Sequence, residues 1–241
     1  MADQNNDFEE LLEGSSLGSR GARELRARTP TFRARAVRSA AASGWWHRYA
    51  DVLPNWYPTF MGLEYEASLI RSYETHFVHG LLQTEAYARA VIREGPGGRR
   101  EEDIDRHVAV RLERQQILTA GNAPQVHAVL DESALRRRGE SRVMSDQLHH
   151  LIEVSERENV RLQIMPLSAG GCPSGAGSFS ILRLAEPEPA DIVYLEQLTS
   201  ALYLDSRSDV AQYEMAMAEL QQNSLTPQQS RDLLRRLTRQ F

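Results

Sequence analysis

Two histidines and a nearby carboxylate, His76, His79 and Glu74, are the residues of this chain best suited to proton transfer. An imidazole titrates near neutral pH, so it can give and accept a proton under physiological conditions. If the turn after His79 lines a pocket, His79 could act as a general acid or base, with Glu74 beside it. The other interpretation is that His79 is one tolerated residue at a permissive turn. We therefore predict a catalytic role for His79 and Glu74 only if the protein is an enzyme.

The same residues match no common metal or cofactor motif. Glu74, His76 and His79 would make at most a loose three-ligand set, and neither an HExxH nor an HxH pattern accompanies them. The single cysteine, Cys172, excludes a thiolate cluster within the chain. The glycine-rich stretch 169–177 leads towards a predicted strand and not into a helix N-terminus, and it carries no Gly-Lys-Ser/Thr. We expect neither a cofactor nor a metal.

Aromatic side chains are dense early in the chain, from Trp45 to Tyr73. Such a run builds a core, or walls a pocket in which a few polar groups orient a flat or apolar ligand. Both interpretations stay open. The residues that we expect to bind a ligand are Trp46, Trp56, Tyr65, Glu64, His76, Gln83 and Tyr87.

Two kinds of periodicity describe the elements that must position these residues. Apolar residues at helical spacing predict helices over 57–75, 83–93 and 101–118, with Thr84 capping the second. Strands are predicted beyond Pro124, interleaved with shorter helices, and the last helix follows the Thr226 cap. The predicted strands are 125–130, 161–166, 178–184, 192–197 and 201–204. The fold class is therefore α/β (α+β): a helical N-terminal half packed on a mixed sheet of about five strands, with C-terminal helices.

Charge and composition divide the chain. Residues 1–42 are predicted to be a disordered or partly helical arginine-rich arm, and residues 43–241 to be one domain with a helical part (43–122) and an α/β part (123–241). The 28 basic residues are all arginine, which suits either anion recognition or a GC-rich genome. The net charge of −5 opposes binding of the whole molecule to nucleic acid.

Several short motifs carry a family resemblance. They are Gly44-Trp45-Trp46, Leu63-Glu64-x-Glu66-Ala67, Tyr73-Glu74, Gly80-Leu81-Leu82-Gln83-Thr84-x-x-Tyr87-Ala88 and Val193-Tyr194-Leu195-Glu196. With them the chain resembles the C-terminal domain of unknown function of actinobacterial, antitoxin-like regulators that carry an XRE-type helix-turn-helix. The family motif has proline where this chain has His79. Residues 1–42, interrupted at Pro30, are expected to be too short for the helix-turn-helix.

The resemblance implies a regulator-like protein that binds a small-molecule ligand or a partner protein, without a DNA-binding domain of its own. The alternative is a cofactor-independent enzyme of a specialised-metabolite pathway, recruited from such an effector domain, that performs a cyclisation, isomerisation or elimination. Direct DNA binding, through residues 20–38, is the least favoured interpretation. We expect a cytoplasmic protein that does not span a membrane, and we leave open whether it forms a homodimer.

Overall fold

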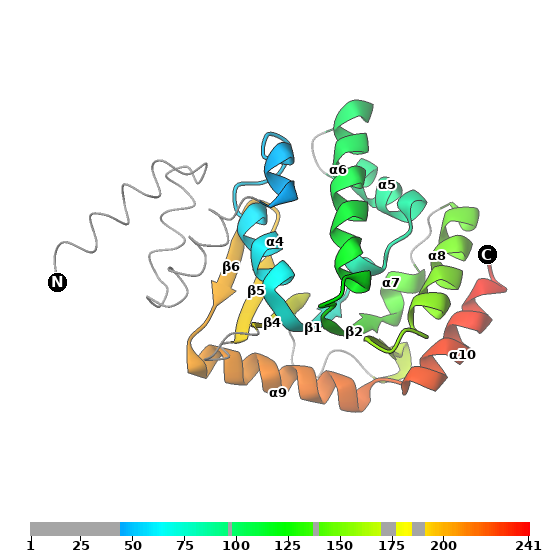
Figure 1. Ribbon diagram of the computed structural model, residues 1–241. Helices are drawn as coiled ribbons and strands as arrows, with labels where there is room; N and C mark the ends of the chain where they lie inside the picture. The colour runs from blue at the N-terminus through cyan, green and yellow to red at the C-terminus, as the bar shows by residue number, and fades with distance from the viewer. Residues whose placement is uncertain (1–43, 96–97, 137–139, 170–176, 185–190) are drawn as a thin grey trace.

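A six-stranded mixed sheet forms the centre of the molecule (Figure 1). The computed structural model describes residues 44–95, 98–136, 140–169, 177–184 and 191–241. The sheet has the order β3-β2-β1-β4-β5-β6. Its strands are β1 (Ala67–Glu74), β2 (Gln125–Asp131), β3 (Val160–Met165), β4 (Phe179–Leu184), β5 (Asp191–Glu196) and β6 (Ala201–Leu204). The predicted α/β class with a mixed sheet is confirmed, with six strands in place of about five.

The direction of the strands changes at β1. Strands β3, β2 and β1 are parallel, whereas β4, β5 and β6 follow as an antiparallel meander. The long β1–β2 and β2–β3 connections carry helices, as parallel pairs require. The carboxyl ends of β1 and β5 therefore lie at the same edge of the sheet as the start of β4. That edge positions the candidate site.

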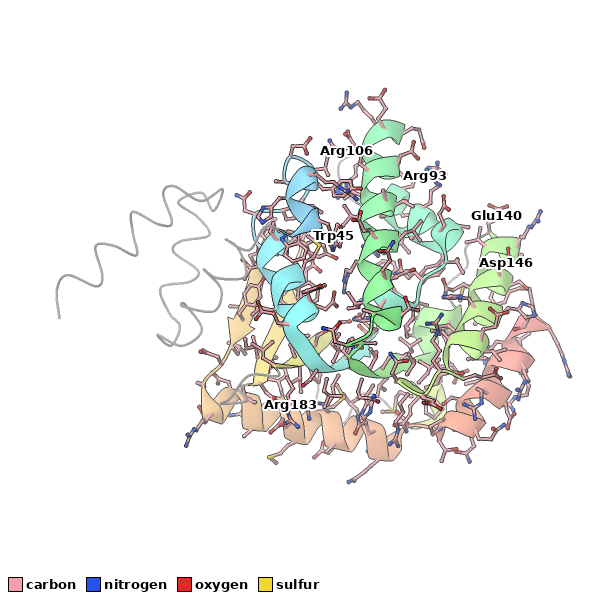
Figure 2. The ribbon with its side chains drawn as sticks, viewed as in Figure 1. Trp45, Arg93, Arg106, Glu140, Asp146 and Arg183 are labelled. Atoms are coloured by element: carbon pink, nitrogen blue, oxygen red, sulfur yellow. The ribbon has the colours of Figure 1, made fainter. Side chains whose placement is uncertain are left out.

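Helices cover both faces of the sheet (Figure 1). Helix α9 lies along one face, in contact with β1, β3 and β5, whereas α4 contacts β1 and β4, and α10 contacts β3 and α8. The helices are α4 (Tyr57–Glu66), α5 (Glu85–Glu94), α6 (Glu101–Arg114), α7 (Glu132–Arg136), α8 (Ser141–Val154), α9 (Arg207–Asn223) and α10 (Pro227–Thr238). The outer sides of α5 and α8 are polar, and Arg93 and Asp146 point away from the sheet there (Figure 2).

The helix predicted over 57–75 was wrong in its second half. Helix α4 ends at Glu66, and the chain continues as the central strand β1. The apolar positions Leu63, Ala67 and Ile70 fit a helical period only by coincidence. Strand geometry sends Ile70 into the larger core cluster and Tyr73 into the cluster on the opposite face of the sheet. Pairing on both sides, with β2 and β4, outweighs the local preference of this segment.

Two helix starts agree better with the sequence. Thr84 caps α5 by accepting a hydrogen bond from the Tyr87 N–H, and Thr226 caps α10 in a capping box with Gln229. The helix predicted over 101–118 is α-helical only to Arg114 and ends in a 3-10 turn. In the described part of the chain, no helix is long and apolar enough to span a membrane.

Three predictions cannot be compared with the described structure. The arginine-rich arm 1–42 and Cys172 lie outside the described residues, as does most of the glycine-rich stretch 169–177. The division of the domain at residue 122 stays a prediction, although β1, from the first part, pairs with β2 and β4 of the second.

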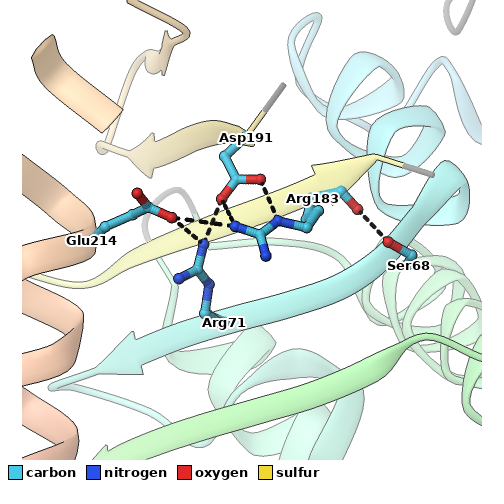
Figure 3. A network of polar contacts seen from close by, with 5 residues as sticks. All are labelled: Ser68, Arg71, Arg183, Asp191 and Glu214. Atoms are coloured by element: carbon cyan, nitrogen blue, oxygen red, sulfur yellow. Dashed lines mark hydrogen bonds and ion pairs between the residues drawn. The ribbon is translucent and has the colours of Figure 1, made fainter. Parts of the chain in front are cut away.

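An ionic network fastens α9 to its face of the sheet (Figure 3). Arg71 on β1 donates to Asp191 at 2.5 Å and to Glu214 of α9 at 3.0 Å. Arg183 on β4 donates to both oxygens of Asp191, each at 2.8 Å, and also reaches Glu214 at 3.3 Å. Burial alone would raise the pKa of Asp191, but the two guanidinium groups outweigh that effect and lower it. The four charged side chains therefore pair with one another and stabilise the packing of α9 on the sheet.

Candidate functional site

A row of hydroxyl groups crosses the face of the sheet opposite α9. Ser72 of β1 pairs in register with Ser180 of β4, Ser180 with Tyr194 of β5, and Tyr194 with Tyr203 of β6. All four residues are buried. The hydroxyls of Ser72 and Tyr194 have no hydrogen-bond partner among the described residues. A buried polar group left in this state costs about 1–3 kcal/mol, so the sheet holds unsatisfied hydrogen-bonding groups where an apolar residue would be more stable.

A buried ion pair lies over this row. Arg114 of α6 donates from two nitrogens to the two oxygens of Glu64 on α4, one contact measuring 2.6 Å, and a third nitrogen reaches the Tyr57 hydroxyl at 2.7 Å. The side chains of Arg114 and Glu64 are 7% and 1% exposed. Burial alone would lower the pKa of Arg114, but the Glu64 carboxylate outweighs it and raises the pKa. Arg114 therefore keeps its charge, and the pair joins the two helices.

Phe60 connects the ion pair to the hydroxyl row. Its ring stacks on Tyr194 with centroids 4.1 Å apart, and the Arg114 guanidinium carbon lies 5.0 Å from the centre of the Phe60 ring. Phe60 is thus packed against a cation and a phenol, an arrangement that cation–π attraction stabilises. Burial raises the pKa of Tyr194 well above its ordinary value, so its hydroxyl keeps its proton. The Arg114–Glu64 ion pair and the hydroxyl row together form what we call the polar cluster. Phe60 connects the two by direct side-chain contact.

The turn after β1 lies against Arg114, and this close approach explains why residue 80 is a glycine. A Cβ atom on Gly80 would lie 2.9 Å from an Arg114 nitrogen that is already held by Tyr57. Gln83 fixes the turn: its amide donates to the Val78 carbonyl at 2.6 Å, and its oxygen accepts from Arg111 at 2.8 Å. The Gly80–Gln83 motif therefore supports Arg111 and Arg114 of α6.

His79 has a structural role in this turn. Its Nδ1 accepts a hydrogen bond from the Leu81 N–H, and burial lowers the pKa of the ring to about 3. The ring is therefore neutral at pH 7, with its proton on Nε2. Its backbone φ of −52° is also one that proline adopts, in keeping with the proline of the family motif. These contacts do not favour the acid–base role predicted for His79.

Among the described carboxyl groups, Glu74 has the pKa that is raised furthest above its ordinary value. It ends β1 on the face that carries Ser72, is partly buried, and hydrogen-bonds Ser178. Burial raises its pKa to about 8, against the opposing effects of Ser178, Arg114 and Arg111. Glu74 is thus largely protonated at pH 7 and able to donate a hydrogen bond or release a proton near neutrality.

The other predicted ligand-binding residues are dispersed. Glu64 is held by Arg114, and Gln83 and Tyr87 hold the backbone of Val78. Trp56 precedes α4, and its indole N–H is buried without a partner among the described residues, while its carbonyl accepts from the Tyr203 hydroxyl. Tyr65 and His76 are exposed, and Trp46 packs in a separate cluster with residues Leu53, Met61 and Val110. One common pocket for the predicted set is therefore not formed.

The sequence reasoning missed the residues at the centre of the cluster, Arg114, Arg111, Ser72 and Tyr194. A signal existed for Arg114, because it stands four residues from both Val110 and Leu118, on an apolar stripe where a cation must find a partner. Tyr194 belonged to a quoted motif that was given no role. No local pattern marks Ser72, which becomes informative only through its strand register.

The donor set does not suggest a metal centre. No group of three or more His, Cys, Asp or Glu side chains suited to a metal ion occurs among the described residues. What the arrangement offers is hydrogen bonding: two unpartnered hydroxyls, the indole N–H of Trp56, a largely protonated Glu74, and Arg111 beside them. Such a set orients a small polar molecule.

One protein family matches most of the chain. Residues 57–236 match the family described as "Domain of unknown function (DUF5753)". The chain belongs to the DUF5753 family. Comparison with curated proteins and with solved structures found no match.

The polar cluster, apart from the Trp56 indole, lies inside the DUF5753 match. The match begins at Tyr57, so it contains Glu64, Ser72, Arg114 and Tyr194, whereas Trp46 and Trp56 precede it. Two of the motifs that carried the resemblance, Gly80–Gln83 and Val193–Glu196, contribute to the cluster. The part of the chain that defines the DUF5753 domain therefore builds most of the candidate site.

Proposed function

We propose that this DUF5753 protein is a regulator-like effector domain that binds a small molecule at the polar cluster. The observation that carries the proposal is the pair of unpartnered, buried hydroxyls of Ser72 and Tyr194 beneath the Arg114–Glu64 pair. Unsatisfied polar groups in a native core call for a partner, and a bound ligand supplies one. An ordered water is the alternative partner.

We further propose how binding is transmitted. The ligand touches Tyr194, which contacts Phe60 and, through it, the ion pair that joins α4 to α6. A change in this contact alters how the two helices pack, and a partner chain responds to the change. This fits the antitoxin-like, actinobacterial regulators with an XRE-type helix-turn-helix that the sequence resembles, and a cytoplasmic location. The net charge of −5 supports action through a partner in preference to direct DNA contact.

Native mass spectrometry of the full chain, before and after incubation with extract of its own cells, tests the proposal. We expect the wild type to retain a small molecule and Tyr194→Phe to lose most of it. Tyr213→Phe is the matched control, because Tyr213 lies on α9 at the opposite face of the sheet. Retention by Tyr194→Phe equal to that of the wild type would show that the cluster is not the site, and a dry or water-filled cluster would retain nothing.

One observation favours the second candidate, a cofactor-independent enzyme of specialised metabolism. Glu74, with a pKa of about 8, suits proton transfer at neutral pH next to the hydroxyl row. In this case the extract yields a new product only with intact protein. Glu74→Gln then abolishes product formation, whereas His79→Pro preserves it, because the His79 ring is neutral and engaged in the turn.

A further inference from the structure

We propose that the ligand is electrically neutral and presents acceptor oxygens, as an amide, ester or ketone does, to the hydroxyls of Ser72 and Tyr194. This inference rests on the proposed function, since it names the ligand class of the same site. It follows from two properties of the cluster: the balance of its charges and the excess of hydrogen-bond donors over acceptors.

The buried charges of the cluster already cancel. Arg114 and Glu64 neutralise each other through two hydrogen bonds, so neither is available to an ionic ligand. Near the pair, Arg111 makes no ion pair with a described residue and donates instead to the Gln83 side-chain oxygen, and the oppositely charged Glu196 is exposed to solvent. A cationic ligand would meet no unpaired buried carboxylate that is largely ionised, and an anionic ligand would meet only Arg111, which Gln83 already engages. Burying an ion without a full counter-charge costs several kcal/mol.

The unpartnered groups are mainly donors. The Trp56 indole N–H can only donate, and the hydroxyls of Ser72 and Tyr194 each carry a proton for which the described residues provide no acceptor. The raised pKa of Glu74 keeps that carboxyl protonated for much of the time, which adds a donor and removes an anion. Hydroxyls can also accept, but a ligand rich in N–H donors would leave the Trp56 N–H unsatisfied. Carbonyl or ester oxygens satisfy the whole set.

Three probes share one benzene ring and carry substituents of different charge at neutral pH: benzamide is neutral, benzoate is anionic and benzylamine is cationic. Isothermal titration of the full chain with each compares their dissociation constants at millimolar concentrations. We expect benzamide to bind at least about tenfold more tightly than the other two, since burial of a charge without a counter-ion costs at least about 1.4 kcal/mol. Tyr194→Phe should weaken benzamide about tenfold, and the control Tyr213→Phe should leave it unchanged.

The outcomes separate this inference from the function on which it rests. If benzoate or benzylamine binds best and Tyr194→Phe weakens that binding, the site is correct and the neutral ligand class is wrong. If benzamide binds equally to the wild type, Tyr194→Phe and Ser72→Ala, the proposed site itself is wrong. Absence of benzamide binding to the wild type also overturns the inference. Ser72→Ala removes only an unpartnered hydroxyl, so it tests the site in a protein that still folds.

Discussion

Replacing Glu64 with glutamine tests the ion pair at the centre of the cluster. The substitution keeps the shape of the side chain and removes its charge, which leaves the Arg114 guanidinium buried with only the Tyr57 hydroxyl and a neutral amide as partners. Breaking one half of a buried pair costs about 3–5 kcal/mol. Because the amide oxygen still accepts one hydrogen bond, we expect a loss near the lower end, about 3 kcal/mol. Urea unfolding followed by circular dichroism measures it.

A surface pair supplies the control. Asp232 and Arg235 on α10 are 2.9 Å apart, with side chains 47% and 49% exposed, so Asp232→Asn should cost less than about 1 kcal/mol. The double variant Glu64→Leu/Arg114→Met, which removes both charges, should recover most of the stability lost in Glu64→Gln. Equal losses for Glu64→Gln and Asp232→Asn, or a double variant less stable than Glu64→Gln, would refute the view that the buried charges depend on each other.

Three further predictions concern the turn and the two titrating carboxyls. His79→Pro should fold with a thermal midpoint within a few degrees of the wild type, because φ is already −52° and only the weak acceptor for Leu81 is lost. Glu74 has a folded pKa of about 8 against an ordinary 4.5, so the unfolded chain releases its proton first and stability falls as pH rises between these values. The full shift corresponds to about 5 kcal/mol, which partial exposure reduces to about 1–3, and Glu74→Gln should remove this loss when urea midpoints at about pH 5 and about pH 8 are compared. Asp191 has a lowered pKa beside Arg183, so its contribution to the free energy of unfolding is present above pH 3.8 and is lost as pH falls through the lower, folded pKa. Asp191→Asn should therefore flatten the acid limb of a stability–pH profile, and an unchanged limb would contradict this.

Local patterns predicted the capped starts of α5 and α10 and most strands because those signals lie in neighbouring residues. Thr84 and Thr226 mark the starts of helices because their side-chain oxygens accept hydrogen bonds from the first turn. The apolar strands beyond Pro124 are bounded by turn residues. Strand β1 escaped prediction because its identity depends on partners far away in the chain, β2 and β4, which supply hydrogen bonds on both sides. Non-local pairing is not encoded in a short window.

The candidate site shows the same limit. Glu64, Glu74 and Gln83 were predicted site residues from a motif-rich part of the chain, but the partners that give them their chemistry come from α6 and β5. His79 attracted attention because its residue type differs from the family motif. Burial then lowers its pKa to about 3 and makes it part of a turn, and burial is a property of the folded chain alone.

The Ser72 hydroxyl should favour ligand binding but lower the stability of the core, and these two effects can be measured separately. In the unliganded protein its buried hydroxyl has no partner among the described residues, so Ser72→Ala should raise the free energy of unfolding by about 1 kcal/mol. If the hydroxyl exists to meet a ligand, the same variant should bind that ligand less tightly, the usual exchange of stability for function. A chemical denaturation series and a titration on the same preparation measure both quantities. A less stable Ser72→Ala would show that water or another group already satisfies the hydroxyl, and would remove the main support for a ligand there.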